Sequence, residues 1–218
     1  MSTLASSRPA SLTGAAPAPP RAAGARRAAV ASAAVGFVLT YLVAVGTPLG
    51  QRLDEAAMQW TAAVVTRDGW AETVLHAVSA GSVLLVGAAL AFVTALTRGP
   101  RVAALGLLSA AAVIVGAQVL KQALTRPDFS VGALANSFPS GHVAAVTGLA
   151  VALLLAVPAG RWRRLALVVV APVVVLTGLA TVVQEWHRPS DVLGSVLLGV
   201  VVALAAAQCE SPLRRRRA

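Results

Sequence analysis

Residues 138–158 read Phe-Pro-Ser-Gly-His-Val-Ala-Ala-Val-Thr-Gly-Leu-Ala-Val-Ala-Leu-Leu-Leu-Ala-Val-Pro, a short polar start followed by a long apolar run. A Pro-Ser-Gly sequence before such a run is typical of a helix start, with Ser140 as the N-cap. The free N–H groups of a first helical turn, helped by the helix dipole, bind anions. This stretch therefore predicts an apolar helix with an anion site at its beginning.

Similar apolar runs recur along the whole chain. Of its residues 57% are hydrophobic and 12% are charged, which is far from the average soluble domain and typical of a membrane protein. At about 1.5 Å per residue each run is about 24 to 32 Å long, close to the roughly 30 Å of a hydrocarbon core. We expect an all-α fold, a bundle of six transmembrane helices. The six expected spans are residues 28–48, 79–97, 102–120, 143–158, 165–183 and 191–207.

Three parts are expected along the chain. Residues 1–27 are rich in Ala, Pro, Ser and Arg, with too little apolar bulk to offset the entropy cost of ordering, so they predict a disordered basic tail. A cleaved signal peptide is the alternative. The following apolar run of about 20 residues exceeds the usual 7 to 15 of a signal sequence, which favours an uncleaved first span. A membrane domain at 28–208 and a basic tail at 209–218 complete the expected organisation.

The placement of charge predicts the orientation. Arginines gather before the first span, in two of the short connections and after the last span, whereas the acidic residues lie mostly in the other connections. By the positive-inside rule, both termini are expected in the cytoplasm and the loops around residues 121–142 and 185–191 outside the cell membrane. We interpret the net charge of +10 as this topology signal, and expect no nucleic-acid partner.

A connecting segment at residues 52–66 has its own pattern. Leu53, Ala57, Trp60 and Val64 recur at helical spacing, with polar side chains off that face. An amphipathic helix lying on the outer leaflet and a helix packed on the bundle both fit this pattern. The lone cysteine, Cys209, predicts neither a disulfide nor a cysteine metal site.

Reactive side chains are few and fall on one side of the expected bundle. Lys121 is the only lysine and ends the third span, His142 opens the fourth, and His187 precedes the sixth. Each alone is usually an interfacial polar residue or part of a turn. Because all three lie at one expected membrane depth, we expect them to converge.

The chemistry of this set fits a phosphate ester. Lys121 and Arg126 supply cations for an anion. The carboxylate of Asp191 can accept a hydrogen bond from one ring nitrogen of His187 and leave the other nitrogen free for attack. His142 is then available to protonate the leaving oxygen.

These residues resemble a known signature. Pro139-Ser140-Gly141-His142, with Lys121 and Arg126-Pro127 upstream and His187-x-x-x-Asp191 downstream, is similar to the three-part motif of the type 2 phosphatidic acid phosphatase superfamily. The resemblance covers spans three to six and implies a metal-independent lipid phosphate phosphatase without a cofactor. It also implies residue roles: His187 forms a phosphohistidine, Asp191 orients it, and His142 protonates the leaving group and then activates water. The phosphoryl oxygens would be held by Lys121, Arg126, Ser140 and Gly141.

The chain departs from this signature in two places. Four residues instead of six separate Lys121 from Arg126, and Ala180-Thr181 stand where the family has Ser-Arg. Loss of one donor from a charge-stabilising site typically costs about 3 to 4 kcal/mol of transition-state stabilisation. We hypothesise that Arg188, beside the expected nucleophile, replaces that arginine as a phosphate-binding residue; a solvated or lipid-facing loop arginine is the alternative.

A second class of function stays open, a non-catalytic membrane protein that binds or moves a lipid phosphate. A coupled transporter would carry an ionisable residue near the bilayer midplane, and the expected spans have none away from their ends. The soluble haloperoxidases that share the motif are disfavoured by six spans. Phosphatidic acid, phosphatidylglycerophosphate and polyprenyl phosphates all remain candidate substrates, and the oligomeric state is not predicted.

Overall fold

A computed structural model describes residues 20–66, 69–132 and 135–215, and these residues form helices and loops without a strand. The predicted all-α fold is therefore confirmed for the described part of the chain. The helices are α1 (Pro20–Thr40), the π-helix η1 (Tyr41–Val45), α2 (Pro48–Val64), α3 (Trp70–Ala77), α4 (Ala80–Arg98), α5 (Pro100–Ala123), α6 (Gly141–Ala156), α7 (Arg161–Val183) and α8 (Pro189–Arg215).

Five helical segments are long and apolar enough to cross a membrane: α1 with η1, α4, α5, α7 and α8. The remaining apolar helix, α6, has 16 residues and is only about 24 Å long at about 1.5 Å per residue. It occupies the place of the predicted fourth span. Within the described residues the structure thus shows five candidate spans, and the count of six remains a prediction.

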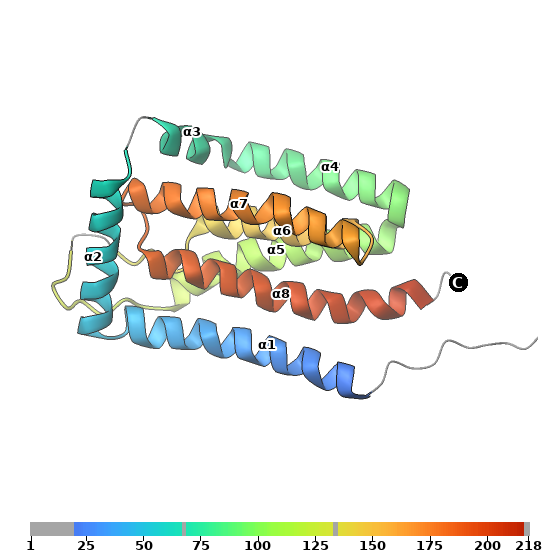
Figure 1. Ribbon diagram of the computed structural model, residues 1–218, viewed down its shortest axis with the longest axis horizontal. Helices are drawn as coiled ribbons and strands as arrows, with labels where there is room; N and C mark the ends of the chain where they lie inside the picture. The colour runs from blue at the N-terminus through green and yellow to red at the C-terminus, as the bar shows by residue number, and fades with distance from the viewer. Residues whose placement is uncertain (1–19, 67–68, 133–134, 216–218) are drawn as a thin grey trace, which may run out of the picture.

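Helix α6 lies at the centre of the bundle. It packs against α4, α5, α7 and α8, and the long helices run side by side (Figure 1). Its contact with α5 is unusually close at Gly148, where an added Cβ would lie 2.9 Å from the backbone oxygen of Ala110. Small residues allow such close backbone approach between membrane helices, so Gly148 determines how tightly α5 and α6 pack.

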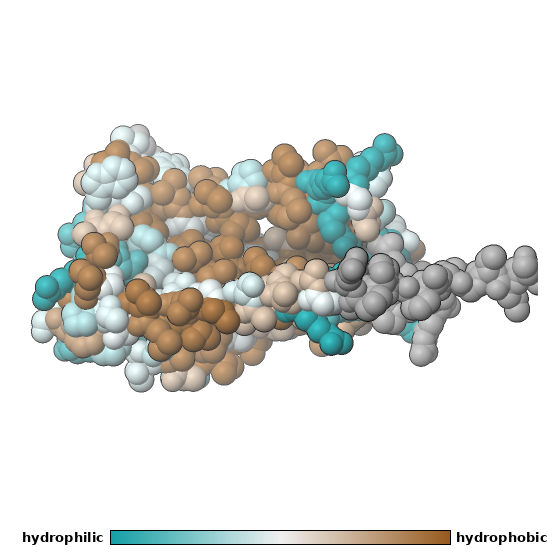
Figure 2. All heavy atoms as spheres, turned by 60° about the horizontal axis from the view of Figure 1, so that its bottom comes forward, coloured by the Kyte–Doolittle hydropathy of each residue, from teal (hydrophilic) through white to brown (hydrophobic). Residues whose placement is uncertain are grey.

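The outside of the bundle is apolar. Leu84 and Leu85 of α4 and Val168 of α7 are 73%, 72% and 71% exposed. Figure 2 shows hydrophobic residues over much of the visible face, with hydrophilic residues gathered toward the two ends. Such a surface suits a lipid environment, and together with the apolar helices it marks a multi-pass membrane protein.

The start of α1 and the end of α8 lie at the same end of the bundle, opposite α2 (Figure 1). Helix α1 begins at Pro20, inside the segment 1–27 predicted as a tail, and α8 continues to Arg215, inside the predicted tail 209–218. Ala and Arg are strong helix formers, so the helices extend past the apolar runs. Residues 1–19 and 216–218 lie outside the described residues, and the domain boundaries stay predictions.

Helix α2 crosses the opposite end of the bundle (Figure 1) and corresponds to the predicted helix at 52–66. It packs on η1, α7 and α8, through a face that buries Gln51, Asp54 and Met58. Leu53 and Trp60, on the predicted apolar face, are instead exposed. The buried face combines the polar Gln51 and Asp54 with the apolar Met58 and Ala62, so it does not coincide with the predicted apolar face.

Candidate active site

The end of α5, the start of α6 and the turn before α8 meet near α2. Lys121 lies in the last turn of α5, His142 in the first turn of α6, and His187 in the turn before Pro189. Together with Gly141, these three side chains line one cavity of about 640 Å³. The expected convergence of the lysine and the two histidines is present in the structure.

The rest of this cavity is mainly apolar and runs between α4 and α5. Its walls include Val83 of α4 and Ile114 of α5, with Gln118 as a polar group near the first turn of α6. A Cβ at Gly141 would lie 3.0 Å from Nε2 of Gln118. The absence of a side chain at Gly141 therefore keeps room for a small group beside the first turn of α6.

His187 is paired with Asp191. Nδ1 of His187 lies 3.3 Å from Oδ2 of Asp191, which is fully buried in the first turn of α8. The spacing of four residues brings the two side chains together because the turn leads directly into the helix. The contact occupies Nδ1 and leaves Nε2 as the ring nitrogen available for attack.

Asp191 also accepts three further hydrogen bonds. Nη2 of Arg126 lies 2.9 Å from Oδ1, while the Ser137 hydroxyl and the backbone N–H of Arg188 donate to Oδ2. A buried carboxylate is tolerated only when it is paired and hydrogen-bonded in this way. Ser137 was missed by the sequence reasoning, although it directly precedes the motif that begins at Phe138.

Arg126 lies beside this site but outside the histidine cavity. It lines a neighbouring cavity of about 250 Å³ with Gln51 and Asn136. Burial lowers the pKa of Arg126, and the charge of Asp191 acts in the opposite direction. Its Nε and Nη1 atoms are buried with no hydrogen-bond partner in the described part of the chain. The residue therefore holds Asp191 and retains two unpaired donors.

Ser140 is the N-cap of α6, as predicted. Its hydroxyl oxygen accepts from the backbone N–H of Val143, at 3.5 Å. Its own N–H donates to the backbone oxygen of Asp191, and its carbonyl accepts from the Ser195 hydroxyl. Since Ser140 is fully buried, it joins α6 to α8, and its neighbour Gly141 forms the cavity wall.

Arg188 does not line the histidine cavity. It is fully buried, and its Nε donates to Oε2 of Glu55 at 2.8 Å while Nη2 donates to the carbonyl of Val131. This placement gives no support to the predicted phosphate-binding role and favours a structural one. Adjacency to His187 in sequence could not reveal this, because neighbouring residues in a turn point in different directions.

Thr181, at the position of the family's missing arginine, is also fully buried. Its hydroxyl donates to the carbonyl of Gly178, and its carbonyl accepts from the N–H groups of Trp186 and His187. The residue shapes the turn that carries His187. Among the described residues that line the histidine cavity, Lys121 is the cation.

Two acidic residues of α2 complete the surroundings, and the sequence reasoning missed both roles. Asp54 accepts from the backbone N–H of Ser190 at 2.9 Å and from its hydroxyl, and Glu55 accepts from Arg188. Burial raises the pKa of Asp54, against the opposing effect of the bonds from Ser190. No sequence signal connects residues that lie so far apart in the chain.

No group of three or more His, Cys, Asp or Glu side chains within the described residues is placed to hold a metal ion. The side chains that converge on the histidine cavity are suited to an anion, since they comprise a lysine, two imidazoles and the first turn of a helix. Such an arrangement can bind a phosphate group and transfer protons to and from it.

Residues 102–215, which are more than half of the chain, match the model of the PAP2 superfamily. The chain belongs to the PAP2 superfamily. This confirms the resemblance drawn from the motifs around His142 and His187. Membership in this superfamily, together with the apolar helices, supports a membrane phosphatase, which is a hydrolase.

One solved structure has the same fold as this PAP2 protein. It is described as the first transmembrane PAP2 type phosphatidylglycerolphosphate phosphatase from Bacillus subtilis. The TM-score is 0.71 at 21% identity, over 85% of this chain and 97% of that chain. No curated protein matches the chain. The solved structure thus supports the arrangement of helices, including those before residue 102.

Proposed function

We propose that this PAP2 protein hydrolyses a phosphomonoester or diphosphate of a lipid through a phosphohistidine intermediate. The observation that carries the proposal is the shared cavity of Lys121, His142 and His187, with Asp191 hydrogen-bonded to Nδ1 of His187. This is the arrangement expected of an oriented nucleophile beside a general acid.

The reaction has two steps. Nε2 of His187 attacks phosphorus, the bond from phosphorus to the lipid oxygen breaks, and His142 donates a proton to that oxygen. His142 then takes a proton from water, whose oxygen attacks the phosphohistidine and releases inorganic phosphate. Asp191 stabilises the positive charge that develops on the His187 ring. No step requires a metal ion.

The phosphoryl oxygens are held mainly at the start of α6. Lys121 and the backbone at Gly141 line the cavity, and the N-cap Ser140 aligns the first N–H groups of the helix. The two unpaired donors of Arg126 are a second source of hydrogen bonds. Arg188 is left out of this site because it is buried against Glu55.

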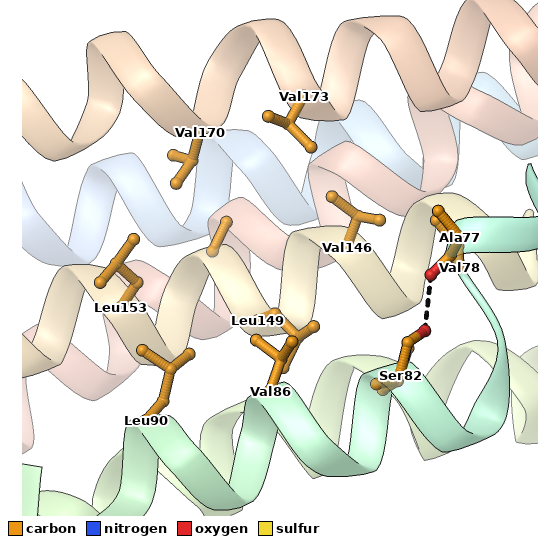
Figure 3. Close-up of a pocket in the computed structure, with 12 residues that line it drawn as sticks. Ala77, Val78, Ser82, Val86, Leu90, Val146, Leu149, Leu153, Val170 and Val173 are labelled. Atoms are coloured by element: carbon orange, nitrogen blue, oxygen red, sulfur yellow. Dashed lines mark hydrogen bonds between the residues drawn. The ribbon is translucent and has the colours of Figure 1, made fainter. Parts of the chain in front are cut away.

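A neighbouring apolar cavity supports a lipid substrate. It has a volume of about 360 Å³ and shares Val78 and Val83 with the histidine cavity. Figure 3 shows side chains of α4, α6 and α7 around it, among them Leu90, Leu149 and Val173. An apolar space of this size beside an anion site suits an acyl or prenyl chain better than a water-soluble phosphate ester.

For the orientation, we propose that the histidine cavity opens on the extracytoplasmic side of the cell membrane. The distribution of arginine supports this orientation. The start of α1 and the end of α8 lie at the end of the bundle opposite α2 (Figure 1), whereas the cavity is lined by the end of α5 and the start of α6, so both termini would be cytoplasmic.

The test is phosphate release by the detergent-purified protein in the presence of a chelator. The panel contains phosphatidic acid, phosphatidylglycerophosphate, and a polyprenyl phosphate and diphosphate. Release from at least one lipid is expected, with none from the matched His187→Ala variant. Equal release by the two proteins would contradict the proposed nucleophile.

One observation favours a second candidate, a protein that binds lipid phosphate without cleaving it. The buried Thr181 brings no cation to the site, so the transition state has fewer charged donors than the family signature provides. Binding of a panel lipid without phosphate release would favour this candidate.

For the hydrolytic mechanism, loss of phosphate release on adding the chelator would contradict metal independence.

A further inference from the structure

Helix α2 lies before the segment that matches the family and holds none of the residues predicted for the site. Its buried face nevertheless contacts both site loops. Nε2 of Gln51 donates to the carbonyls of Val45 and Pro127, at 2.8 and 2.9 Å. One turn further on, Asp54 and Glu55 reach the turn that carries the nucleophile.

Asp54 caps α8 from another helix. The first N–H groups of a helix have no partner within it, and Pro189 at the first position has no N–H. Ser190 supplies the next one, and Asp54 accepts both this N–H and the Ser190 hydroxyl. A carboxylate at this position also meets the positive end of the α8 dipole. Asp54 therefore holds the start of α8 in place.

Glu55 holds the other side of the same turn. Its carboxylate pairs with the buried guanidinium of Arg188 and lies directly against Gly132. A Cβ at Gly132 would be 2.6 Å from the carboxylate carbon, and its φ of +65° also favours glycine. Because Gly132 has no side chain, the Glu55 carboxylate has room to reach Arg188.

The two contacts both lie directly after the proposed nucleophile. Arg188 follows His187 directly, and Ser190 precedes Asp191, so α2 grips the turn on both sides of Pro189. Within the described residues, the hydrogen bond that the imidazole makes is the 3.3 Å contact of its Nδ1 with Asp191. Its direction therefore depends on how firmly the backbone of the turn is held.

We propose that Asp54 and Glu55 are positioning residues for the nucleophile, acting through Ser190 and Arg188 to aim the His187 ring into the cavity. The inference rests on the proposed function in one respect, the role of His187. A shift of about 1 Å at a reacting group can cost about 10² in rate, so the contacts of α2 would contribute to the catalytic geometry although no α2 residue lines the histidine cavity.

The first experiment is kinetic. Asp54→Ala and Glu55→Ala are each expected to lower kcat by up to about 10² with little change in KM, since binding groups stay in place. Asp54→Asn should recover most of the rate, because its amide oxygen accepts the Ser190 N–H and its amide nitrogen donates to the Ser190 hydroxyl. Arg52→Gln, on the exposed side of α2, is the control and should keep the wild-type rate.

The second experiment needs no substrate. Diethyl pyrocarbonate modifies accessible imidazoles, and peptide mass spectrometry reports each histidine separately. His187 is only 7% exposed, so a loosened turn in Asp54→Ala should raise its modification rate several-fold. Asp54→Asn should leave that rate unchanged. His76, which is exposed in α3, is the internal reference in every variant.

The two experiments separate the inference from the function. A raised His187 modification rate in Asp54→Ala, in a protein that releases no phosphate from any lipid, would support the positioning role and contradict the proposed hydrolysis. An unchanged modification rate and unchanged kcat in Asp54→Ala would overturn the inference. So would equal losses in Asp54→Ala and Asp54→Asn. If Asp54→Ala does not fold, Glu55→Ala takes its place. A lower kcat and a raised His187 modification rate in Glu55→Ala, with values close to the wild type in Asp54→Asn, would support the inference, and wild-type values in Glu55→Ala would overturn it.

Discussion

Asp191 is the residue on which the site depends most. It accepts hydrogen bonds from Arg126, Ser137 and the backbone of Arg188 besides its contact with His187. The same carboxylate therefore pairs with the proposed nucleophile and with a buried cation. Replacing Asp191 by alanine would affect catalysis and stability together. The substitution Asp191→Asn, which keeps the size of the side chain, is therefore more informative.

His187→Ala should abolish turnover, whereas Asp191→Asn should leave a measurable residual rate. The first change removes the proposed nucleophile, and the second removes only the charge and the preferred tautomer of the ring, which in a comparable triad costs about 10⁴ in kcat. Phosphate release under single-turnover conditions measures both. A wild-type rate in His187→Ala on a verified lipid would show that another residue attacks.

Arg188→Ala should lower both stability and kcat, because it removes the ion pair through which Glu55 is proposed to hold the turn of His187. It would leave Glu55 without its buried partner, and breaking a buried pair typically costs about 3 to 5 kcal/mol. Thermal unfolding in detergent, read together with kcat at saturating lipid, distinguishes the possibilities. A loss in kcat well beyond that of Glu55→Ala, at unchanged Tm, would instead support the phosphate-binding role that the sequence suggested for Arg188.

The sequence predicted those site residues whose spacing carries information. Lys121, His142 and His187 fall at the ends of apolar runs, so their common membrane depth followed from the positions of the spans. The partners Asp54 and Glu55 did not follow, because their contacts cross more than half of the chain. The phosphate-binding role of Arg188 stays a prediction, and its ion pair with Glu55 could not be predicted because no local pattern encodes such a tertiary contact.

Among the elements, the contact between α5 and α6 is sensitive to side-chain size because a Cβ at Gly148 would meet the backbone of α5. Both helices carry site residues at their adjoining ends, Lys121 on α5 and His142 on α6. Any change in their separation therefore changes the distance between the cation and the proposed acid. The apolar runs were enough to predict these helices. The close approach at Gly148 could not be predicted, because it depends on how α5 and α6 pack against each other.

Gly148→Ala should destabilise the protein and reduce turnover. The new methyl group would meet the backbone oxygen of Ala110 at 2.9 Å, and overpacking typically costs about 1 to 3 kcal/mol. Gly116→Ala is the matched control, because the nearest heavy atom to its Cβ is a side-chain carbon of Leu198 at 3.9 Å. Thermal unfolding of the two variants should differ; equal stability would show that the helices separate at no cost.

For the whole molecule, the arginines at the end of the bundle opposite α2, which predict the orientation, also take part in helix packing. Glu210 of α8 pairs with Arg98 of α4 and Arg163 of α7 and is 4% exposed. Two of the arginines counted in the orientation rule thus also join three helices. The sequence predicted that these arginines lie on the same side of the membrane. Their pairing with Glu210 could be seen only in the folded structure.

The orientation can be tested by labelling single cysteines in intact cells. In a background that lacks Cys209, an impermeant thiol reagent should label Val131→Cys, near the site, because the arginine-poor side is expected outside. Ala159→Cys, in the exposed connection between α6 and α7, should react only after the membrane is opened. The opposite pattern would place the site in the cytoplasm.

Helix α2 has one side exposed at the surface of the molecule and the other side packed against the candidate site. Leu53 and Trp60 on its outer side are 63% and 68% exposed, while Asp54 on its inner side holds the first turn of α8. If the outer leaflet covers that apolar side, as for an interfacial helix, the lateral pressure of the lipids acts on the same helix that is proposed to position His187. The protein would then sense how tightly its surrounding lipids are packed, and its rate in micelles would differ from its rate in a bilayer of the same substrate content.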